Sequence, residues 1–166
     1  MNMKNREIEK RGAGTTDGGK HLTFKLENEE YGIEILKIKE IIGVMRITTV
    51  PQTPDYVKGV INLRGKIIPV VDLRMMFGMA TQEYSERTCI VVVEIHRASG
   101  AVFVGLVVDE VSEVVNLNRD DIEDSPEFSV DLDTDYILGL AKTDDGVKIL
   151  LDIEGMLNTD EIGLAA

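Results

Sequence analysis

Residues 57–74, VKGVINLRGKIIPVVDLR, decide the fold, because they read as two apolar strands joined by a short turn. Gly65 supplies the permissive backbone that lets the chain reverse. Arg64 places a single positive charge at the tip of the predicted hairpin, where a partner could reach it; the alternative is an ordinary turn that happens to contain arginine. The flanking apolar residues are Val60, Ile61, Leu63, Ile67, Ile68, Val70 and Val71.

An internal repeat relates residues 56–77 to residues 136–157 after a shift of 80 positions. Both segments predict strand, turn, strand and a short helix capped by an aspartate, Asp72 or Asp152. Two copies of a small β unit predict two related barrels packed side by side. The second hairpin tip, residues 142–146, has ordinary turn residues, so only the first tip is specialised. The matched pairs include Tyr56 and Tyr136, Gly59 and Gly139, and Met76 and Met156.

Composition narrows the class of protein. The chain has 166 residues, is 43% hydrophobic and carries a formal net charge of −12, which disfavours binding to nucleic acid. Its longest apolar runs are too short to cross a membrane, and direct membrane insertion is not expected. Residues 1–19 lack an apolar face and are expected to form a flexible tail. A β domain is expected over 20–158, with 159–166 as the C-terminal end.

No catalytic centre is expected. Gly14, Gly19 and Lys20 fit the spacing of a phosphate-binding loop, but His21 replaces the Ser or Thr that would hold magnesium, and a strand follows instead of a helix. A nucleotide-binding enzyme remains an alternative that an ATP titration would test. Both histidines, His21 and His96, are expected at the surface.

Metal sites are not expected either. Asp131, Asp133 and Asp135 resemble the start of a calcium loop, but Tyr136 stands where that loop requires Gly, and Lys142 where it requires Glu. These aspartates are interpreted as a solvated acidic loop. No metal, cofactor or catalytic residue is therefore predicted.

The strand around Cys89, residues 88–95, is apolar on both faces and should be covered on both. Such a strand could line a groove between two barrels, and Cys89 itself is expected to act as a small buried hydrophobe. Val111 and Val114 are similar candidates for the groove, and ordinary core packing is the alternative for both.

The pattern G-V-x-N-L-R-G-x-I-x-P-x-V-D-L-R in residues 59–74 resembles the signature of the CheW family of bacterial chemotaxis adaptors. The resemblance continues in EEYGIEILKIKEI, VVDEVSEVV, PEFSV, YILGL and ILLDIEGMLN, and so covers nearly everything after His21. It implies a mainly β fold of two interlocked five-stranded SH3-like barrels with short capping helices. It further implies a non-enzymatic, cytoplasmic scaffold held at the inner face of the membrane through receptor arrays.

The resemblance also implies two partners and their contact residues. One is the cytoplasmic tip of methyl-accepting chemotaxis proteins, and the other is the regulatory domain of the histidine kinase CheA. Kinase contacts are expected on the barrel surfaces. The receptor contacts implied are Ile38, Glu40, Arg64, Cys89, Val111 and Val114, with Arg64 expected to pair with Glu40. The kinase or array contacts implied are Lys58, Gly59 and Phe128.

Several alternatives remain open. Phe128 could be tucked into a core instead of exposed. Glu123 is not among the expected contacts, because the segment before Pro126 is strongly acidic and a contact that a base makes in relatives would not transfer. The same module also occurs at the regulatory end of CheA and in CheV-type adaptors. Neither is expected here, because the first needs ATP-site motifs upstream and the second a receiver domain downstream.

Overall fold

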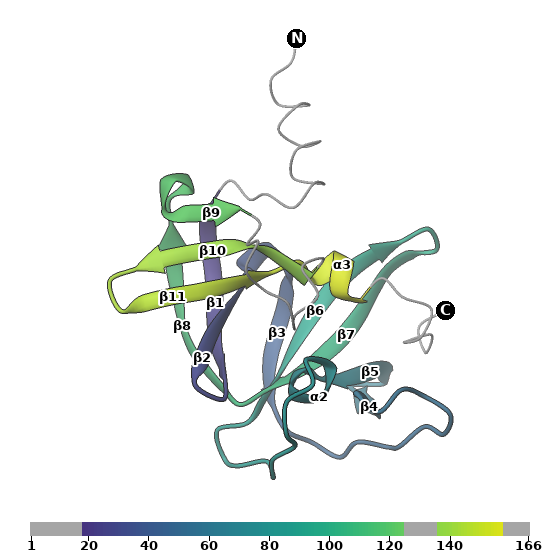
Figure 1. Ribbon diagram of the computed structural model, residues 1–166. Helices are drawn as coiled ribbons and strands as arrows, with labels where there is room; N and C mark the ends of the chain where they lie inside the picture. The colour runs from purple at the N-terminus through teal and green to yellow at the C-terminus, as the bar shows by residue number, and fades with distance from the viewer. Residues whose placement is uncertain (1–17, 125–135, 158–166) are drawn as a thin grey trace.

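The computed structural model describes residues 18–124 and 136–157, which are almost entirely β-structure (Figure 1). The expectation of a mainly β fold is confirmed. Phe128 and the aspartates at 131, 133 and 135 lie outside the described residues. The strands are β1 Gly19–Leu26, β2 Glu29–Glu34, β3 Ile38–Gly43, β4 Val57–Leu63, β5 Lys66–Asp72, β6 Cys89–Arg97, β7 Gly100–Val108, β8 Glu110–Leu117, β9 Ile122–Asp124, β10 Ile137–Thr143 and β11 Gly146–Leu151. Short helical elements are η1 Ile35–Lys37, α2 Leu73–Met76, η2 Arg119–Asp121 and α3 Ile153–Leu157.

The strands form two mixed sheets. The first sheet has the order β8-β1-β2-β11-β10-β9, and the second has the order β3-β6-β7-β5-β4. Each contains one parallel pair, β2 with β11 in the first sheet and β5 with β7 in the second. The second sheet has the expected five strands. The first has six, because β9 adds a short ladder to β10.

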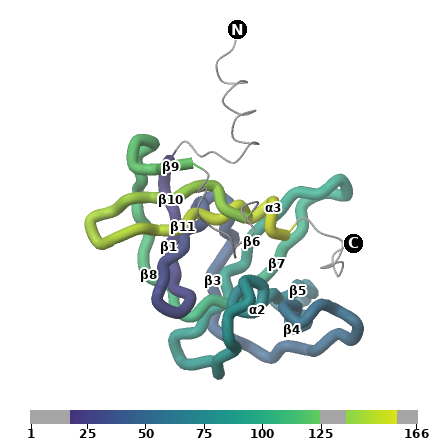
Figure 2. The backbone as a smooth tube through the Cα atoms, viewed as in Figure 1, coloured from purple at the N-terminus to yellow at the C-terminus, as the bar shows by residue number. Residues whose placement is uncertain are grey.

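The two sheets are interlocked by an exchange of strands (Figure 1, Figure 2). Strand β3 follows the β1–β2 hairpin of the first sheet but pairs with β6 in the second. Strand β8 follows the β6–β7 hairpin of the second sheet but pairs with β1 in the first. Each sheet is therefore completed by a strand from the hairpin of the other.

The hydrogen-bond ladders do not close either sheet into a barrel. In each sheet, however, a short connection brings the two edge strands close together. In the first sheet, the edge strands β8 and β9 are separated only by Asn118 and the turn η2. In the second sheet, the chain after β3 reaches the opposite edge strand through a bridge between Thr48 and Val60. Each sheet therefore curls toward a barrel.

The two segments of the sequence repeat have the same pairing. In β4–β5, Val57 pairs with Val71 and the register then shifts before Gly59. In β10–β11, Ile137 pairs with Leu151 and the shift falls before Gly139. Each helix follows its aspartate: Asp72 accepts hydrogen bonds from the amides of Arg74 and Met75, and Asp152 accepts one from Gly155. These contacts satisfy amides that a short helix leaves without internal partners.

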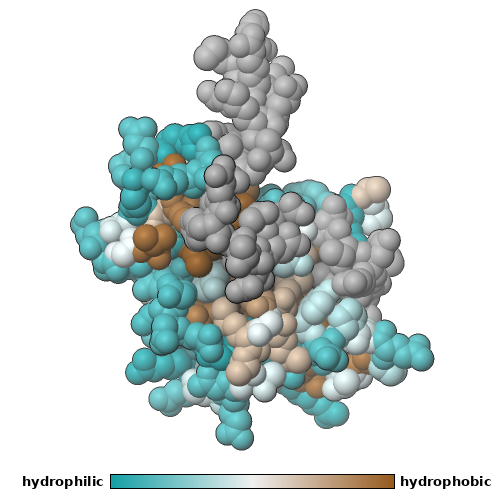
Figure 3. All heavy atoms as spheres, viewed as in Figure 1, coloured by the Kyte–Doolittle hydropathy of each residue, from teal (hydrophilic) through white to brown (hydrophobic). Residues whose placement is uncertain are grey.

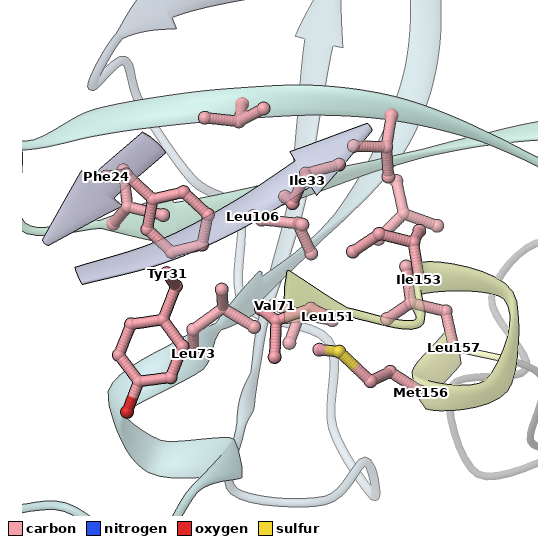
Figure 4. Packing of buried hydrophobic residues seen from close by; sticks show 14 of the residues in the cluster. Phe24, Tyr31, Ile33, Val71, Leu73, Leu106, Leu151, Ile153, Met156 and Leu157 are labelled. Atoms are coloured by element: carbon pink, nitrogen blue, oxygen red, sulfur yellow. The ribbon is translucent and has the colours of Figure 1, made fainter. Parts of the chain in front are cut away.

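A central core joins the two sheets and both helices (Figure 4). The rings of Phe24 and Tyr31 stack there with centroids 5.9 Å apart, and Met156 and Leu157 of α3 pack into the same cluster. Fully burying each such side chain stabilises the fold by about 1.5–3 kcal/mol. Two smaller clusters fill the inner sides of the curled sheets. One contains Ile61, Ile68, Val70, Ile90, Val92 and Val107, and the other contains Leu117, Ile122, Leu138, Ala141 and Leu150.

The structure corrects one expectation and confirms another. His21 was expected at the surface but is only 1% exposed. It lies in β1, which has β2 on one side and β8 on the other, and its Nδ1 lies 3.0 Å from the carbonyl oxygen of Gly19. Gly19 and Lys20 belong to the same extended strand, so they do not form a phosphate-binding loop. His96 is exposed, as expected.

Candidate partner-binding site

The tip of the β4–β5 hairpin is a two-residue turn with a defined shape. Leu63 pairs with Lys66, which leaves Arg64 and Gly65 as the central residues. Both have positive φ, 52° and 89°, the combination found in type I′ turns that match the twist of a hairpin. The side chain of Asn62 accepts a hydrogen bond of 2.8 Å from the amide of Gly65 and so holds the turn.

Arg64 donates a hydrogen bond from its guanidinium to the carboxylate of Glu40 on β3, which confirms the expected pair. The Arg64 side chain remains 70% exposed. The hydrogen bond and the negative charge of Glu40 raise the pKa of Arg64 above its usual value. Because β3 and β4 are the opposite edges of the second sheet, this ion pair spans the gap between them.

Gly59 shapes the strand below this tip. Its φ is 143°, and a Cβ atom built on it would lie 2.0 Å from the carbonyl oxygen of Thr48. Thr48 and Val60 exchange two backbone hydrogen bonds, of 2.8 and 2.9 Å, at this point. Lys58 lies in the register shift beside Gly59 and is partly exposed. Gly59 is therefore required for the close approach of the chain after β3.

The six candidate receptor contacts fall into two groups. Glu40, Ile38 and Cys89 belong to the β3–β6 ladder of the second sheet, and Arg64 joins them through Glu40. Val111 and Val114 lie on β8 in the first sheet, opposite Phe24 and Leu22 of β1. Ile38, Cys89 and Val111 are all partly buried against the central core, so they lie at the junction of the sheets. Val114 instead faces outward and is 52% exposed.

Strand β6 confirms that an apolar strand with little alternation is covered on both faces. Val91 and Val93 point into the central core, while Ile90 and Val92 point into the core of the second sheet. Cys89, at the start of the strand, was expected to be buried but is only partly buried. Its thiol donates a hydrogen bond of 3.3 Å to the carbonyl oxygen of Arg87.

Sequence reasoning missed a buried ion pair at the crossover between the sheets. Arg74 of α2 donates to both carboxylate oxygens of Asp109, over 2.7 and 2.6 Å, and to the carbonyl oxygen of Ala80. Asp109 also accepts the amide proton of Glu27. Burial by itself would raise the pKa of Asp109, but the hydrogen bonds from Arg74 and Glu27 lower it overall. The only sequence signal was that Arg74 directly follows the capping motif.

Exposed apolar residues were also missed. Ile67 and Val147 occupy equivalent places just after the two hairpin turns and are 61% and 51% exposed. Ile41 on β3 and Val114 on β8 are also exposed and occupy equivalent places in the two sheets. Ile41 pairs with Val91, which pairs with Leu106 of β7. In the same way, Val114 pairs with Leu22, which pairs with Ile33 of β2. Figure 3 shows apolar atoms gathered amid a polar surface over the part of the molecule that carries β10 and β11.

These features define a class of protein. An exposed arginine at a hairpin tip, together with partly buried apolar side chains at a junction of two sheets, is typical of proteins that dock other proteins. Within residues 18–124 and 136–157, no three metal-ligating side chains gather into a possible metal site. In the same ranges, no helix has the length and apolar character needed to span a membrane.

Comparisons with known proteins identify the family. The model of the CheW-like domain matches residues 20–161. The chain is 45% identical to the chemotaxis protein CheW of Klebsiella aerogenes, over 92% of this chain and 89% of that protein. It is 32% identical to CheW of Bacillus subtilis, over 86% and 89% of the two chains.

A solved structure agrees with the sequence comparisons. The scaffolding protein TtCheW of Thermoanaerobacter tengcongensis matches with a TM-score of 0.77 and 36% identity, over 87% of this chain and 95% of that one. The chain belongs to the CheW family of chemotaxis coupling proteins, which are non-enzymatic scaffolds.

Proposed function

We propose that this protein couples the cytoplasmic tips of methyl-accepting chemotaxis proteins to the regulatory domain of the histidine kinase CheA. The observation that carries the proposal is the Arg64–Glu40 pair, which holds an exposed guanidinium at the edge of the second sheet. A positioned guanidinium can bind a carboxylate or a carbonyl group on a partner with defined geometry. The protein would work in the cytoplasm, at the inner face of the membrane.

The receptor-binding surface comprises both groups of residues, three of which lie at the junction of the sheets. Ile38, Cys89 and Val111 offer apolar contact beside the central core, and Arg64 with Glu40 offers directional hydrogen bonds. A receptor helix could lay an apolar stripe along this junction and meet Arg64 at one side. The full set proposed is Ile38, Glu40, Arg64, Cys89, Val111 and Val114.

The kinase would bind elsewhere, on the outer surfaces of the sheets. Lys58 and Gly59 lie on the edge strand β4. Lys58 falls in the register shift between Val57 and Gly59 and is partly exposed. Phe128 completes the contacts proposed for the kinase or for array assembly. Ile67 and Val147, which each follow a hairpin turn, support a sheet-surface contact with a related β domain, because both are exposed apolar side chains.

The test is a pull-down with two separate baits, a receptor cytoplasmic fragment and the CheA regulatory domain. We expect wild-type protein to bind both and Arg64→Ala to bind only the kinase domain. Arg87→Ala is the matched control, because Arg87 is similarly exposed and pairs with Glu110 over 3.5 Å. Loss of both partners with Arg64→Ala, or of neither, would contradict this division of surfaces.

A further inference from the structure

Two pockets occupy equivalent places in the two halves of the molecule. We call them the α2 pocket, with a volume of about 440 Å³, and the α3 pocket, with a volume of about 550 Å³. Each lies between a helix of the sequence repeat and the crossover that carries the chain to the exchanged strand. Three lining residues of the α2 pocket have counterparts in the α3 pocket: Asp72 corresponds to Asp152, Arg74 to Glu154, and Asp109 to Leu36.

The α2 pocket is lined by the chain's own segment between α2 and β6. Residues 82–85, together with Arg87 and Thr88, contribute to its wall. The hydroxyl of Tyr84 donates a hydrogen bond of 3.2 Å to the carboxylate of Asp72. Arg87 of the same segment pairs with Glu110. An aromatic side chain and a base, three residues apart, thus anchor this segment to the pocket.

The α3 pocket has an apolar floor and an apolar rim. Its floor contains Leu138, Leu151 and Ile153, which are 8%, 1% and 2% exposed. Its rim carries Leu36, which is 93% exposed, the highest fraction among the large hydrophobic residues that the structure describes. At the matching place in the α2 pocket stands Asp109, bonded to Arg74. A leucine so exposed is unfavourable in water and favours contact with a partner.

The charge around the α3 pocket selects the partner. Its lining contains the carboxylates of Glu34, Glu94, Asp152 and Glu154, against one lysine, Lys37, and the exposed His96. Lys37 is already paired with Glu154 over 3.2 Å, and Lys39, outside the lining, is paired with Glu94 over 3.4 Å. His96 lies 3.4 Å from Glu154 and 3.8 Å from Glu94. The charges of Glu34 and Asp152 remain to give the pocket its negative character. The pocket therefore repels acidic segments and attracts basic ones.

This charge also disfavours two alternative occupants. The sequence after α3 contains Asp160 and Glu161, which have the same sign as the pocket. A second copy of the chain carries a net charge of −12 and would be repelled as well.

We propose that the α3 pocket binds an extended segment of a partner protein that carries a large apolar or aromatic side chain next to lysine or arginine. The apolar side chain packs between Leu36 and the floor, and the basic residue meets the carboxylates at the rim. The carboxylate of Asp152 can accept a hydroxyl hydrogen bond from the segment, as Asp72 does from Tyr84. None of the residues that line the pocket is among the six proposed receptor contacts, although Ile38 adjoins Lys37, and the site does not depend on Arg64.

The probe is derived from the segment that lines the α2 pocket. It is a fluorescein-labelled peptide of residues 82–88 carrying Glu83→Lys and Glu86→Lys, which keeps Tyr84 and Arg87 and becomes basic. Anisotropy titrations with the full chain should show saturable binding of this peptide. The unaltered acidic peptide should bind at least about tenfold more weakly, because the rim repels it. No binding of the basic peptide, or equal binding of both peptides, overturns the proposal.

Variants then locate the binding site. Leu36→Ser should weaken binding of the basic peptide at least about tenfold, because it removes the apolar rim. Val44→Ser is the matched control, an exposed apolar residue outside the pocket, and should leave the titration unchanged. Equal affinity of wild type and Leu36→Ser would reveal unspecific charge attraction and overturn the proposal. Arg64→Ala should bind the peptide normally, which separates this result from the receptor test.

Discussion

Arg64 and Glu40 form an ion pair at a place where the other half of the molecule has two acids. By the strand pairing, Arg64 corresponds to Asp144 in the turn between β10 and β11, and Glu40 corresponds to Glu113 on β8. Asp144 and Glu113 carry charges of the same sign and both line a pocket at the end of the first sheet. Two halves with matching strand pairing thus differ in charge at the centre of the hairpin turn, which is a cation in the first and an acid in the second.

Replacing Arg64 by alanine should separate binding from stability. Exposed ion pairs contribute little to the free energy of unfolding, and the Arg64 side chain is 70% exposed, so the urea midpoint should hardly move. Receptor-dependent activation of CheA should fall by most of its amplitude in a reconstituted assay, while binding of the kinase regulatory domain persists. A midpoint that falls together with activity would make Arg64 a structural residue.

Exchanging the charges tests whether the pair itself matters. Glu40→Arg combined with Arg64→Glu can restore an ion pair, but it moves the cation from the hairpin tip to β3. We expect the double variant to remain folded and to stay inactive with receptors, because the guanidinium has changed place. Full recovery of receptor coupling would mean that the pair stabilises the edge without presenting Arg64.

Gly59→Ala should destabilise the protein strongly. The added Cβ would lie 2.0 Å from the carbonyl oxygen of Thr48, and the φ of 143° is unfavourable for alanine. We expect a loss of at least about 2 kcal/mol in the free energy of unfolding, measured by urea denaturation. Gly146→Ala is the control, because its φ of 130° is similarly unfavourable but no atom lies within 4 Å of the added Cβ. Equal losses in the two variants would refute the steric argument.

Arg74→Met should reveal the buried ion pair with Asp109. The side chain of Arg74 is 11% exposed and that of Asp109 is 28% exposed, so the variant leaves a largely buried carboxylate without its cation. We expect a loss of about 2–3 kcal/mol at pH 7 in a urea titration. Arg87→Met, which removes an exposed pair with Glu110, should cost far less.

The same variant predicts a dependence on pH. Because the folded state lowers the pKa of Asp109 below 3.8, the stabilisation is complete above that value and disappears as the pH falls through the lower folded pKa. The difference in unfolding free energy between wild type and Arg74→Met should therefore be constant from pH 7 to about 5 and shrink below about 4. A difference that stays constant to pH 2 would show that Asp109 is not the group involved.

Removing residues 1–17 should leave the fold intact. The segment offers no apolar face to bury, and the first described strand begins at Gly19. The melting temperature of the shortened chain should lie within about 2 °C of that of the full chain in calorimetry. A clearly lower value would show that the segment packs on the domain.

Local patterns in the sequence were sufficient to predict the hairpins, the capping aspartates and the buried strand β6. The hairpin at residues 57–72 follows from apolar runs on either side of Arg64 and Gly65. The structural equivalence of residues 56–77 and 136–157 follows from their sequence match after a shift of 80 positions. The exchange of β3 and β8 could not be derived in this way. Strand pairing depends on contacts between distant segments, and only the family resemblance implied that the sheets interlock.

The candidate site was predicted unevenly for the same reason. The pairing of Arg64 with Glu40 was expected because the resemblance placed both near one surface, and their contact is observed. The burial of His21 was missed because the polar residues before it suggested a chain end. The two strands that cover it are formed by residues 29–34 and 110–117, and the second of these is distant in the sequence. Arg74 and Asp109 are 35 residues apart, and no local pattern indicates that they meet.

The exchange of β3 and β8 has a mechanical consequence. Two short crossovers, Ile35–Lys37 and Asp109, join the sheets, so the sheets can separate further than these segments reach only if the ladder of β3 with β6 or that of β8 with β1 is broken. If a receptor contacts one sheet, as proposed, we expect its displacement to move both sheets together as one body. Such a structure suits a scaffold that transmits a signal by changing its position and not its conformation.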